Sequence, residues 1–220
     1  MKATYISILL LITVAISTTQ AQDVNFRALN SSKHLISAHA RVDVATNYGF
    51  SYGYIFRNRL TPIVIGTEFT VPFGNEILDD WKWKTSIQAE VYKWRNFSVV
   101  FKPAFSWRRF ETPLAIMQNF RADLSLTAGY STTTWGLMAV AGFDKSIATR
   151  IKHGLLADYY PGIKDGWYGQ GGGNFRFAAR AHVTVNSWGA FLTAGKQFGQ
   201  DFEDNPTIPF YTELSLQKRF

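Results

Sequence analysis

The chain has 220 residues, of which 46% are hydrophobic and 16% aromatic, and its formal net charge is +7 at pH 7. It contains no cysteine, which excludes a disulfide framework, a lipid-attachment site and thiol chemistry. The mean hydropathy of −0.08 argues against a helical membrane protein. The basic residues do not cluster along the sequence, so the positive charge does not indicate a nucleic-acid partner.

The first 21 residues resemble a secretory signal peptide. Lys2 precedes an apolar run from Ile6 to Ile16, and the small residues Thr19 and Ala21 occupy positions that a signal peptidase reads. We therefore expect the mature chain to start at Gln22. A retained membrane anchor is the alternative, but the run is short for a spanning helix and its flanks fit cleavage better.

Alternation between apolar and polar residues runs along almost all of the remaining chain. Successive side chains of a strand point to opposite faces, so this alternation predicts strands with one apolar and one polar face. The clearest case sets Trp81 and Trp83 against Lys82 and Lys84. The ten predicted strands are 35–46, 48–57, 62–73, 81–92, 97–108, 120–131, 135–144, 173–186, 188–198 and 210–220. We therefore predict an all-β domain over residues 35–220.

The final alternating segment ends on the aromatic residue Phe220. A terminal phenylalanine on such a strand resembles the assembly signal of bacterial outer-membrane β-barrel proteins, and the mature chain resembles small porin-like and OmpA-type barrels in architecture. The resemblance implies an antiparallel transmembrane β-barrel in the bacterial outer membrane, with both termini and the segment 22–34 on the periplasmic side. It also implies contact with outer-membrane lipid and lipopolysaccharide, and with the barrel-assembly machinery through the C-terminal strand.

The large aromatic residues offer an independent test of this class. Five tryptophans lie on apolar faces at or near the ends of their segments, which predicts a girdle at the two membrane interfaces. A soluble β-sandwich is the alternative, but its largest aromatic residues would tend toward strand centres. The predicted girdle comprises Trp81, Trp83, Trp107, Trp135, Trp188 and Phe220.

Ten strands divide the connections into two groups by length. The short connections are 58–61, 93–96, 132–134 and 186–187, and the longer ones are 74–80, 109–119, 145–172 and 199–207. Short periplasmic turns and long outer loops are typical of outer-membrane barrels. The longest connection, 145–172, has room for two further short strands, so twelve strands are the alternative.

The polar faces of the predicted strands all point into one lumen. Interlocked ion pairs that fill a narrow barrel are one interpretation, because barrels near eight strands leave just enough room for side chains. A basic pore that attracts anions is the other, and its filter would be Lys84, Lys102, Arg121, Arg176 and Arg180. The full predicted set is Arg41, Asp43, Glu68, Lys84, Glu90, Lys102, Arg121, Asp123, Arg176, Arg180 and Glu213.

The predicted outer loop 145–172 mixes aromatic and basic residues, as binding surfaces do. The candidate binding residues are Lys152, His153, Tyr159, Tyr160, Trp167 and Tyr168. A lid over the barrel mouth is the alternative. The glycines of 169–173 are not a phosphate cradle, because a strand rather than a helix follows them; they are expected to let the loop bend.

Motifs for catalysis and metal binding are weak. The chain has neither Gly-x-Ser-x-Gly nor His-Glu-x-x-His. His153 with Asp158 or Asp165 and a nearby serine is a conceivable catalytic group, but lone loop histidines are usually solvated. Weak calcium candidates, for which simple solvation is the usual explanation, are Asp79, Asp80, Asp201, Glu203 and Asp204. We predict no enzyme activity, cofactor or metal.

These features predict a non-enzymatic outer-membrane barrel with a structural or binding role, able to join a larger outer-membrane complex through its loops. A narrow, porin-like channel that prefers anions is the alternative, and an outer-membrane barrel enzyme is a third class. The sequence identifies no ligand and no partner protein.

Overall fold

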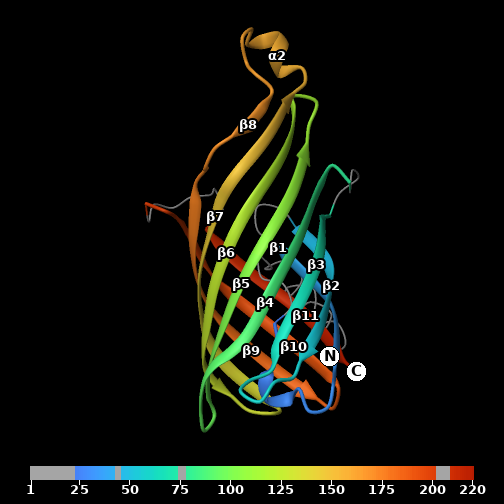
Figure 1. Ribbon diagram of the computed structural model, residues 1–220, viewed down its shortest axis with the longest axis vertical. Coiled ribbons are helices and arrows are strands. Elements are labelled where there is room, and N and C mark those ends of the chain that lie inside the picture. The colour runs from blue at the N-terminus through green and yellow to red at the C-terminus, as the bar shows by residue number, and fades with distance from the viewer. Residues whose placement is uncertain (1–22, 43–45, 74–77, 202–208) are drawn as a thin grey trace, which may run out of the picture.

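Figure 1 shows the computed structural model, which describes residues 23–42, 46–73, 78–201 and 209–220. The predicted signal peptide lies outside the described residues, as do Asp43, Glu203 and Asp204. Ten antiparallel strands form a closed barrel, which confirms the predicted fold class. They are β1 (His34–Val42), β2 (Thr46–Phe56), β3 (Ile63–Pro72), β4 (Asp80–Trp94), β5 (Phe97–Glu111), β6 (Ala115–Ser131), β7 (Trp135–His153), β9 (Gly173–Val185), β10 (Trp188–Gly199) and β11 (Phe210–Arg219).

The strands pair around the barrel in sequence order. β1 pairs with β11 and β6 pairs with β7, so the described strands close the sheet on itself. A short strand, β8 (Gly166–Tyr168), pairs with β7 alone and lies outside the closed sheet. β9 therefore pairs directly with β7. The barrel has ten strands, and the twelve-strand alternative is not found.

The barrel buries its polar face and exposes its apolar face. Along β1, buried positions alternate with exposed ones from Leu35 to Arg41. Large apolar side chains on the outside remain open, such as Phe50 with 67% of its surface exposed, Phe69 and Leu126. A sandwich would bury its apolar faces between two sheets, so both the closed topology and this burial pattern exclude it.

Short connections lie at one end of the barrel, which we call the short-turn end (57–62, 95–96, 132–134 and 186–187). Arg95 and Asn186 have positive φ angles of 50° and 51°. Such angles are what two-residue hairpin turns require. The short turns fall where alternation of the sequence predicts them.

At the opposite end, β5, β6 and β7 rise beyond their neighbours and carry the short helix α2 (Leu156–Tyr159) at their tip. The predicted loop 109–119 reduces to a turn at 112–114, and the predicted loop 145–172 begins as strand β7. The register shifts where Phe120 pairs with Ala148 and Arg121 with Ser146. The extra residue, Ile147, changes the phase of the alternation, which is why the sequence pattern appears to end near Asp144.

The segment before β1 lies inside the barrel at the short-turn end. We call residues 23–33, with the 3-10 helix η1 (Phe26–Ala28), the N-terminal plug. Phe26 and Leu29 pack with Leu35, Ile55, Val64 and Val100 in an apolar cluster. The periplasmic location of segment 22–34 stays a prediction; its described residues fill the short-turn end of the barrel. Its lack of periodicity gave no indication of this placement.

Candidate functional site

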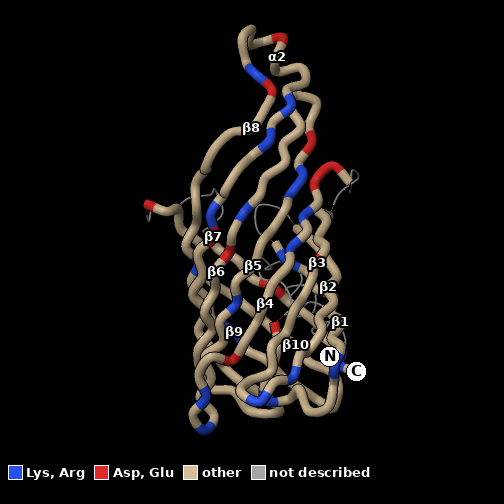
Figure 2. The backbone as a smooth tube through the Cα atoms, in the orientation of Figure 1, with Lys and Arg blue, Asp and Glu red and all other residues tan. Residues whose placement is uncertain are grey.

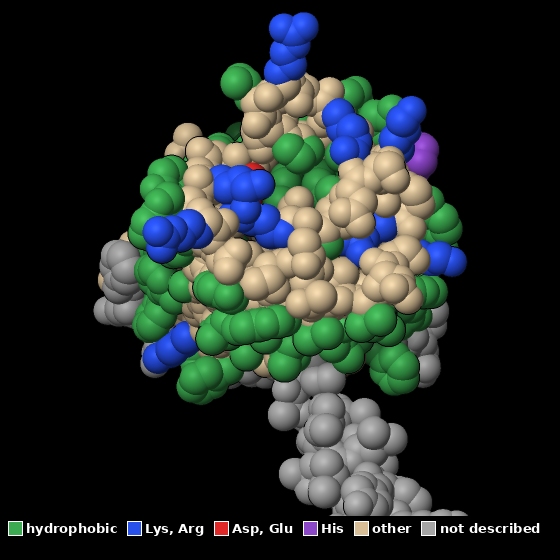
Figure 3. All heavy atoms as spheres, turned by 90° about the horizontal axis from the view of Figure 1, so that it is seen from below, with side chains coloured by type: hydrophobic (Ala, Val, Ile, Leu, Met, Phe, Trp, Pro, Cys, Tyr) green, Lys and Arg blue, Asp and Glu red, His purple; other side chains and the backbone are tan. Residues whose placement is uncertain are grey.

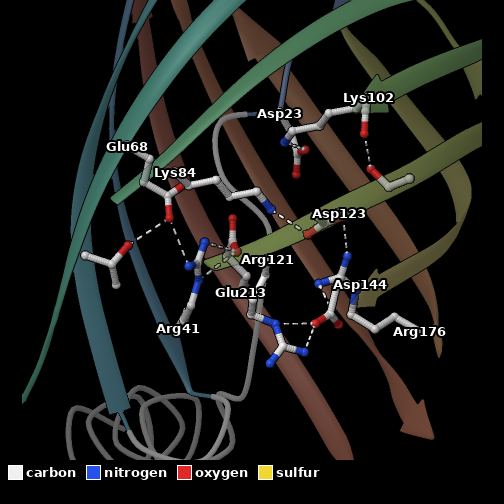
Figure 4. A network of polar contacts seen from close by, with 12 residues as sticks. Asp23, Arg41, Glu68, Lys84, Lys102, Arg121, Asp123, Asp144, Arg176 and Glu213 are labelled. Atoms are coloured by element: carbon white, nitrogen blue, oxygen red, sulfur yellow. Dashed lines mark hydrogen bonds and ion pairs between the residues drawn. The ribbon is translucent and has the colours of Figure 1, made fainter. Parts of the chain in front are cut away.

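The interior of the barrel holds a network of ion pairs (Figure 4). Arg41 on β1 lies between two carboxylates. Its Nη1 is 2.9 Å from Oε1 of Glu68 on β3, and its Nη2 is 3.1 Å from Oε2 of Glu213 on β11. The hydroxyl of Thr70 also donates to Glu68 Oε1 at 2.8 Å. Arg41 and both carboxylates are almost completely buried, so the three charges interact with one another out of contact with solvent.

A second group is centred on Asp123 of β6. Lys84 Nζ is 2.7 Å from Asp123 Oδ2, and Arg176 Nη2 is 2.7 Å from Asp123 Oδ1. Beside them Arg121 donates through Nε to Asp144 Oδ2 at 2.7 Å. Figure 4 shows these side chains pointing toward one another across the lumen. Lys84 on β4 and Arg176 on β9 were both predicted for the anion filter, and both are paired with the carboxylate of Asp123.

The N-terminal plug supplies the carboxylate for the remaining lumen cations. Asp23 Oδ2 is 2.7 Å from Arg180 Nη2, and Asp23 Oδ1 is 3.5 Å from Lys102 Nζ. Near the same end, Arg27 Nε lies 3.4 Å from Glu90 Oε1. Each described member of the predicted lumen set therefore has an oppositely charged partner. Asp43 lies outside the described residues.

Hydrogen bonds hold the plug in the short-turn end. The Asn25 side chain donates to the Thr132 carbonyl at 2.9 Å, and the Gln217 side chain donates to the Asp23 carbonyl at 2.9 Å. Arg219 donates to the Ala28 carbonyl. Seen from below, this end is filled with atoms (Figure 3). A small cavity above the plug, lined by Lys102, Arg180 and His182 among others, has room for about one water molecule.

Sequence reasoning missed three residues of this network. Asp144 is an even-numbered residue of β7, as are the buried residues Gly136 and Met138. The alternation along this strand would therefore have placed the Asp144 side chain in the lumen. Asp23 and Arg27 lie in a segment without alternation, and no sequence pattern would have placed them in the lumen.

The outer segment 154–168 does not close the barrel mouth. We call the part of β5, β6 and β7 that rises beyond the other strands the tall wall, and the end of the barrel that carries it the tall end. Figure 1 shows α2 at the tip of the tall wall, beyond the rim. Tyr159 and Tyr160 are exposed there, at 73% and 63%. His153 donates its backbone N–H to Asp165 Oδ1 at 2.8 Å, and its ring Nδ1 lies 3.0 Å from the same oxygen. These hydrogen bonds, first from the backbone and then from the ring, lower the pKa of Asp165.

The other candidate binding residues, Lys152, Trp167 and Tyr168, make separate contacts. Trp167 lies on the outer face, with its ring centroid 5.6 Å from that of Phe120, and β8 places it beside Arg150. Lys152 is exposed on β7. The Tyr168 hydroxyl donates to the Lys164 carbonyl at 2.7 Å. The six candidates therefore do not converge on one pocket.

The predicted girdle residues lie on the outside of the barrel in two bands. Trp81, Trp83 and Trp107 lie at the tall end of β4 and β5, and the ring centroids of Trp81 and Trp107 are 4.8 Å apart. Trp135, Trp188 and Phe220 lie at the short-turn end and are about half exposed. The apolar outer faces of the strands separate the bands.

The histidines and acidic loop residues show no catalytic arrangement in the described contacts. His39 and His182 are buried in the lumen, while His153 contacts Asp165 but has no serine among its recorded partners. Of the calcium candidates, Asp80 pairs with Arg108. In the described part of the chain, no three acidic or histidine side chains group so as to hold a metal ion.

Neither a protein-family model nor a curated protein sequence matches this chain. Across the described residues, none of the helices has the length and apolar character that a membrane span needs.

Proposed function

We propose that this chain is a non-enzymatic bacterial outer-membrane β-barrel with a filled lumen and a structural or binding role. The observation that carries the proposal is the burial pattern: a closed barrel with an apolar exterior and an ion-paired interior. Hydrocarbon cannot satisfy backbone hydrogen bonds, so a closed barrel is one of only two structures that can cross it. An apolar outer face with a polar lumen is the form such barrels take.

The two aromatic bands support a membrane position. Tryptophan prefers the boundary between hydrocarbon and water. In this proposal Trp83 and Trp107 mark one interface, while Trp135, Trp188 and Phe220 mark the other, with outer-membrane lipid between them. The short-turn end then faces the periplasm, and β11 engages the barrel-assembly machinery during insertion.

A filled lumen agrees better with the contacts than an open pore does. The cations that would select anions are paired with carboxylates, and the N-terminal plug occupies one end. One observation favours the alternative, a narrow anion-preferring channel. A pocket toward the tall end is lined by Arg41, Lys82 and Arg108 together with Asp80, and such a basic vestibule would attract anions.

The exposed tip of the tall wall is the region we propose for binding another outer-membrane component, either a protein or lipopolysaccharide. Tyr159 and Tyr160 are open to solvent, and Lys152 lies on the wall below them. Tryptophan, tyrosine and arginine are enriched at the positions that contribute most to binding between proteins.

The mature chain, refolded into detergent micelles and then vesicles, tests the proposal. We expect β-type circular dichroism, heat-modifiable migration on gels and no steady current in a planar bilayer. Solubility without detergent would contradict the membrane assignment. Steady anion-selective current steps from a folded barrel would contradict the filled lumen and support the channel.

A further inference from the structure

Charge is distributed unevenly at the short-turn end. Exposed side chains there include Lys33, Arg59, Lys93 and Arg95, and Figure 3 shows this face with many basic and almost no acidic side chains. Figure 2 shows the same imbalance along the backbone. The nearby acidic residue Glu90 is buried and contacts Arg27. This end therefore presents a positive surface that the ion pairs of the lumen do not neutralise.

These four cations and Lys218 form a contiguous set, which we call the basic arc: Lys33, Arg59, Lys93, Arg95 and Lys218. Lys33 is the last residue of the plug before β1, and Lys218 lies on β11. Arg59 and Arg95 lie in the turns after β2 and β4, and Lys93 lies near the end of β4, so the arc spans neighbouring elements of the barrel. The other half of the rim carries the uncharged turns 132–134 and 186–187. Arg57 is not counted, because it donates to the Ser32 carbonyl of the plug at 2.9 Å. Among the described contacts, no member of the arc is in an ion pair.

Outward-facing aromatic residues lie beside the arc. Lys218 Nζ is 5.1 Å from the ring centroid of Trp188 and 5.0 Å from that of Phe220. The guanidinium carbon of Arg95 is 5.3 Å from the centroid of Trp94. Trp94 and Trp188 are 60% and 54% exposed. Contacts with aromatic rings therefore place two of the five cations, Arg95 and Lys218, at the same depth as the aromatic band.

We propose that the basic arc binds phosphate groups of anionic phospholipids in the leaflet that meets the short-turn end. This inference rests on the membrane position proposed above. At the depth of interfacial tryptophans the surrounding anions are lipid phosphates, and lysine and arginine near a membrane surface attract anionic lipids. A protein docked on the centre of this face would meet the plug. Four of the five cations belong instead to the strands and turns around it, and Lys33 directly precedes β1. The position of the arc therefore favours lipid as the ligand.

Lipid selectivity measured by tryptophan quenching tests this inference. The refolded barrel would be placed in phosphatidylcholine vesicles with increasing amounts of brominated phosphatidylglycerol, and quenching would report the relative binding of the two lipids. The test variant combines Lys93→Gln and Arg95→Gln. The matched control combines Arg150→Gln and Lys164→Gln, which removes the same charge from exposed positions at the other end.

We expect the native barrel to prefer phosphatidylglycerol roughly ten-fold, with the preference falling as salt increases. The short-turn variant should lose most of this preference, and the control variant should retain it. Equal affinity of the native barrel for both lipids would overturn the inference, as would equal losses in the two variants. Abolition of the preference by added inorganic phosphate would also overturn it, since the arc would then take a free anion. Failure to enter pure phosphatidylcholine vesicles would instead remove the proposed function on which the inference rests.

Discussion

Arg180 Nη2 on β9 lies 2.7 Å from Asp23 Oδ2 of the N-terminal plug, and both side chains are buried. This contact joins a strand of the barrel to a segment that precedes it by more than half the chain. It supplies the counter-charge for a cation that would otherwise face an open lumen. The plug is therefore part of the interior charge balance as well as a steric block.

Asp23→Asn should loosen the plug. The substitution removes the carboxylate that lies between Arg180 and Lys102 in a buried site, which we expect to lower the free energy of unfolding by about 3 kcal/mol. Transient current steps should appear in a planar bilayer where the native barrel is silent. Asp158→Asn, the same chemical change at an exposed position, serves as the control. A variant that is both silent and as stable as the native protein would show that the ion pair does not hold the plug.

Asp123 should be the most sensitive position of the second ion-pair group. It accepts from both Lys84 and Arg176 at 2.7 Å. Asp123→Asn therefore removes the carboxylate of Lys84 and leaves Arg176 with only Asp144, whose Oδ1 lies 3.9 Å from Arg176 Nη1. We expect a loss of about 3–5 kcal/mol in urea unfolding of the refolded barrel. Lys84→Met should cost less, because Asp123 keeps Arg176. If both variants unfold at the native urea concentration, the lumen is hydrated and the filled interior is wrong.

The strands were predictable from sequence because burial in a barrel imposes a two-residue period. That period fails at several places for physical reasons, and two of them affected the prediction most. Ile147 is an extra residue in β7 and shifts the phase, so the strand was predicted to end before it does. The plug from Asp23 onward has no period, because side chains inside the barrel end contact it from several directions.

The lumen-facing residues were predictable, but their partners were not. Parity places Arg41 and Glu68 on the inner face. It does not indicate that Arg176 on β9 reaches Asp123 on β6, because β7 lies between these strands. Contacts across a lumen depend on side-chain length and barrel diameter, which a sequence pattern does not encode. The choice between a filled lumen and a pore therefore needed the structure.

Gly49 allows β2 to pass beneath the ring of His39. A Cβ atom at this position would lie 2.5 Å from the Phe69 carbonyl oxygen and 2.6 Å from His39 Nε2. Gly49→Ala must therefore displace backbone or ring, at a cost of roughly 1–3 kcal/mol in urea unfolding. Gly169→Ala, which meets nothing within 4 Å, should leave the unfolding midpoint unchanged. Equal behaviour of the two variants would show that both the backbone at Phe69 and the ring of His39 yield at little cost.

Acid should release the contact between His153 and Asp165 at the tip of the tall wall. Because hydrogen bonds lower the pKa of Asp165 below its ordinary 3.8, their stabilisation is fully present above that value and is lost as the pH falls through the lowered one. The backbone amide of His153, followed by NMR in micelles, should shift with a midpoint below 3.8. The backbone amides of the other barrel strands should show no shift at this midpoint. Asp165→Asn should abolish this transition, and a midpoint at or above the ordinary value would show that the amide of His153 does not donate to the carboxylate.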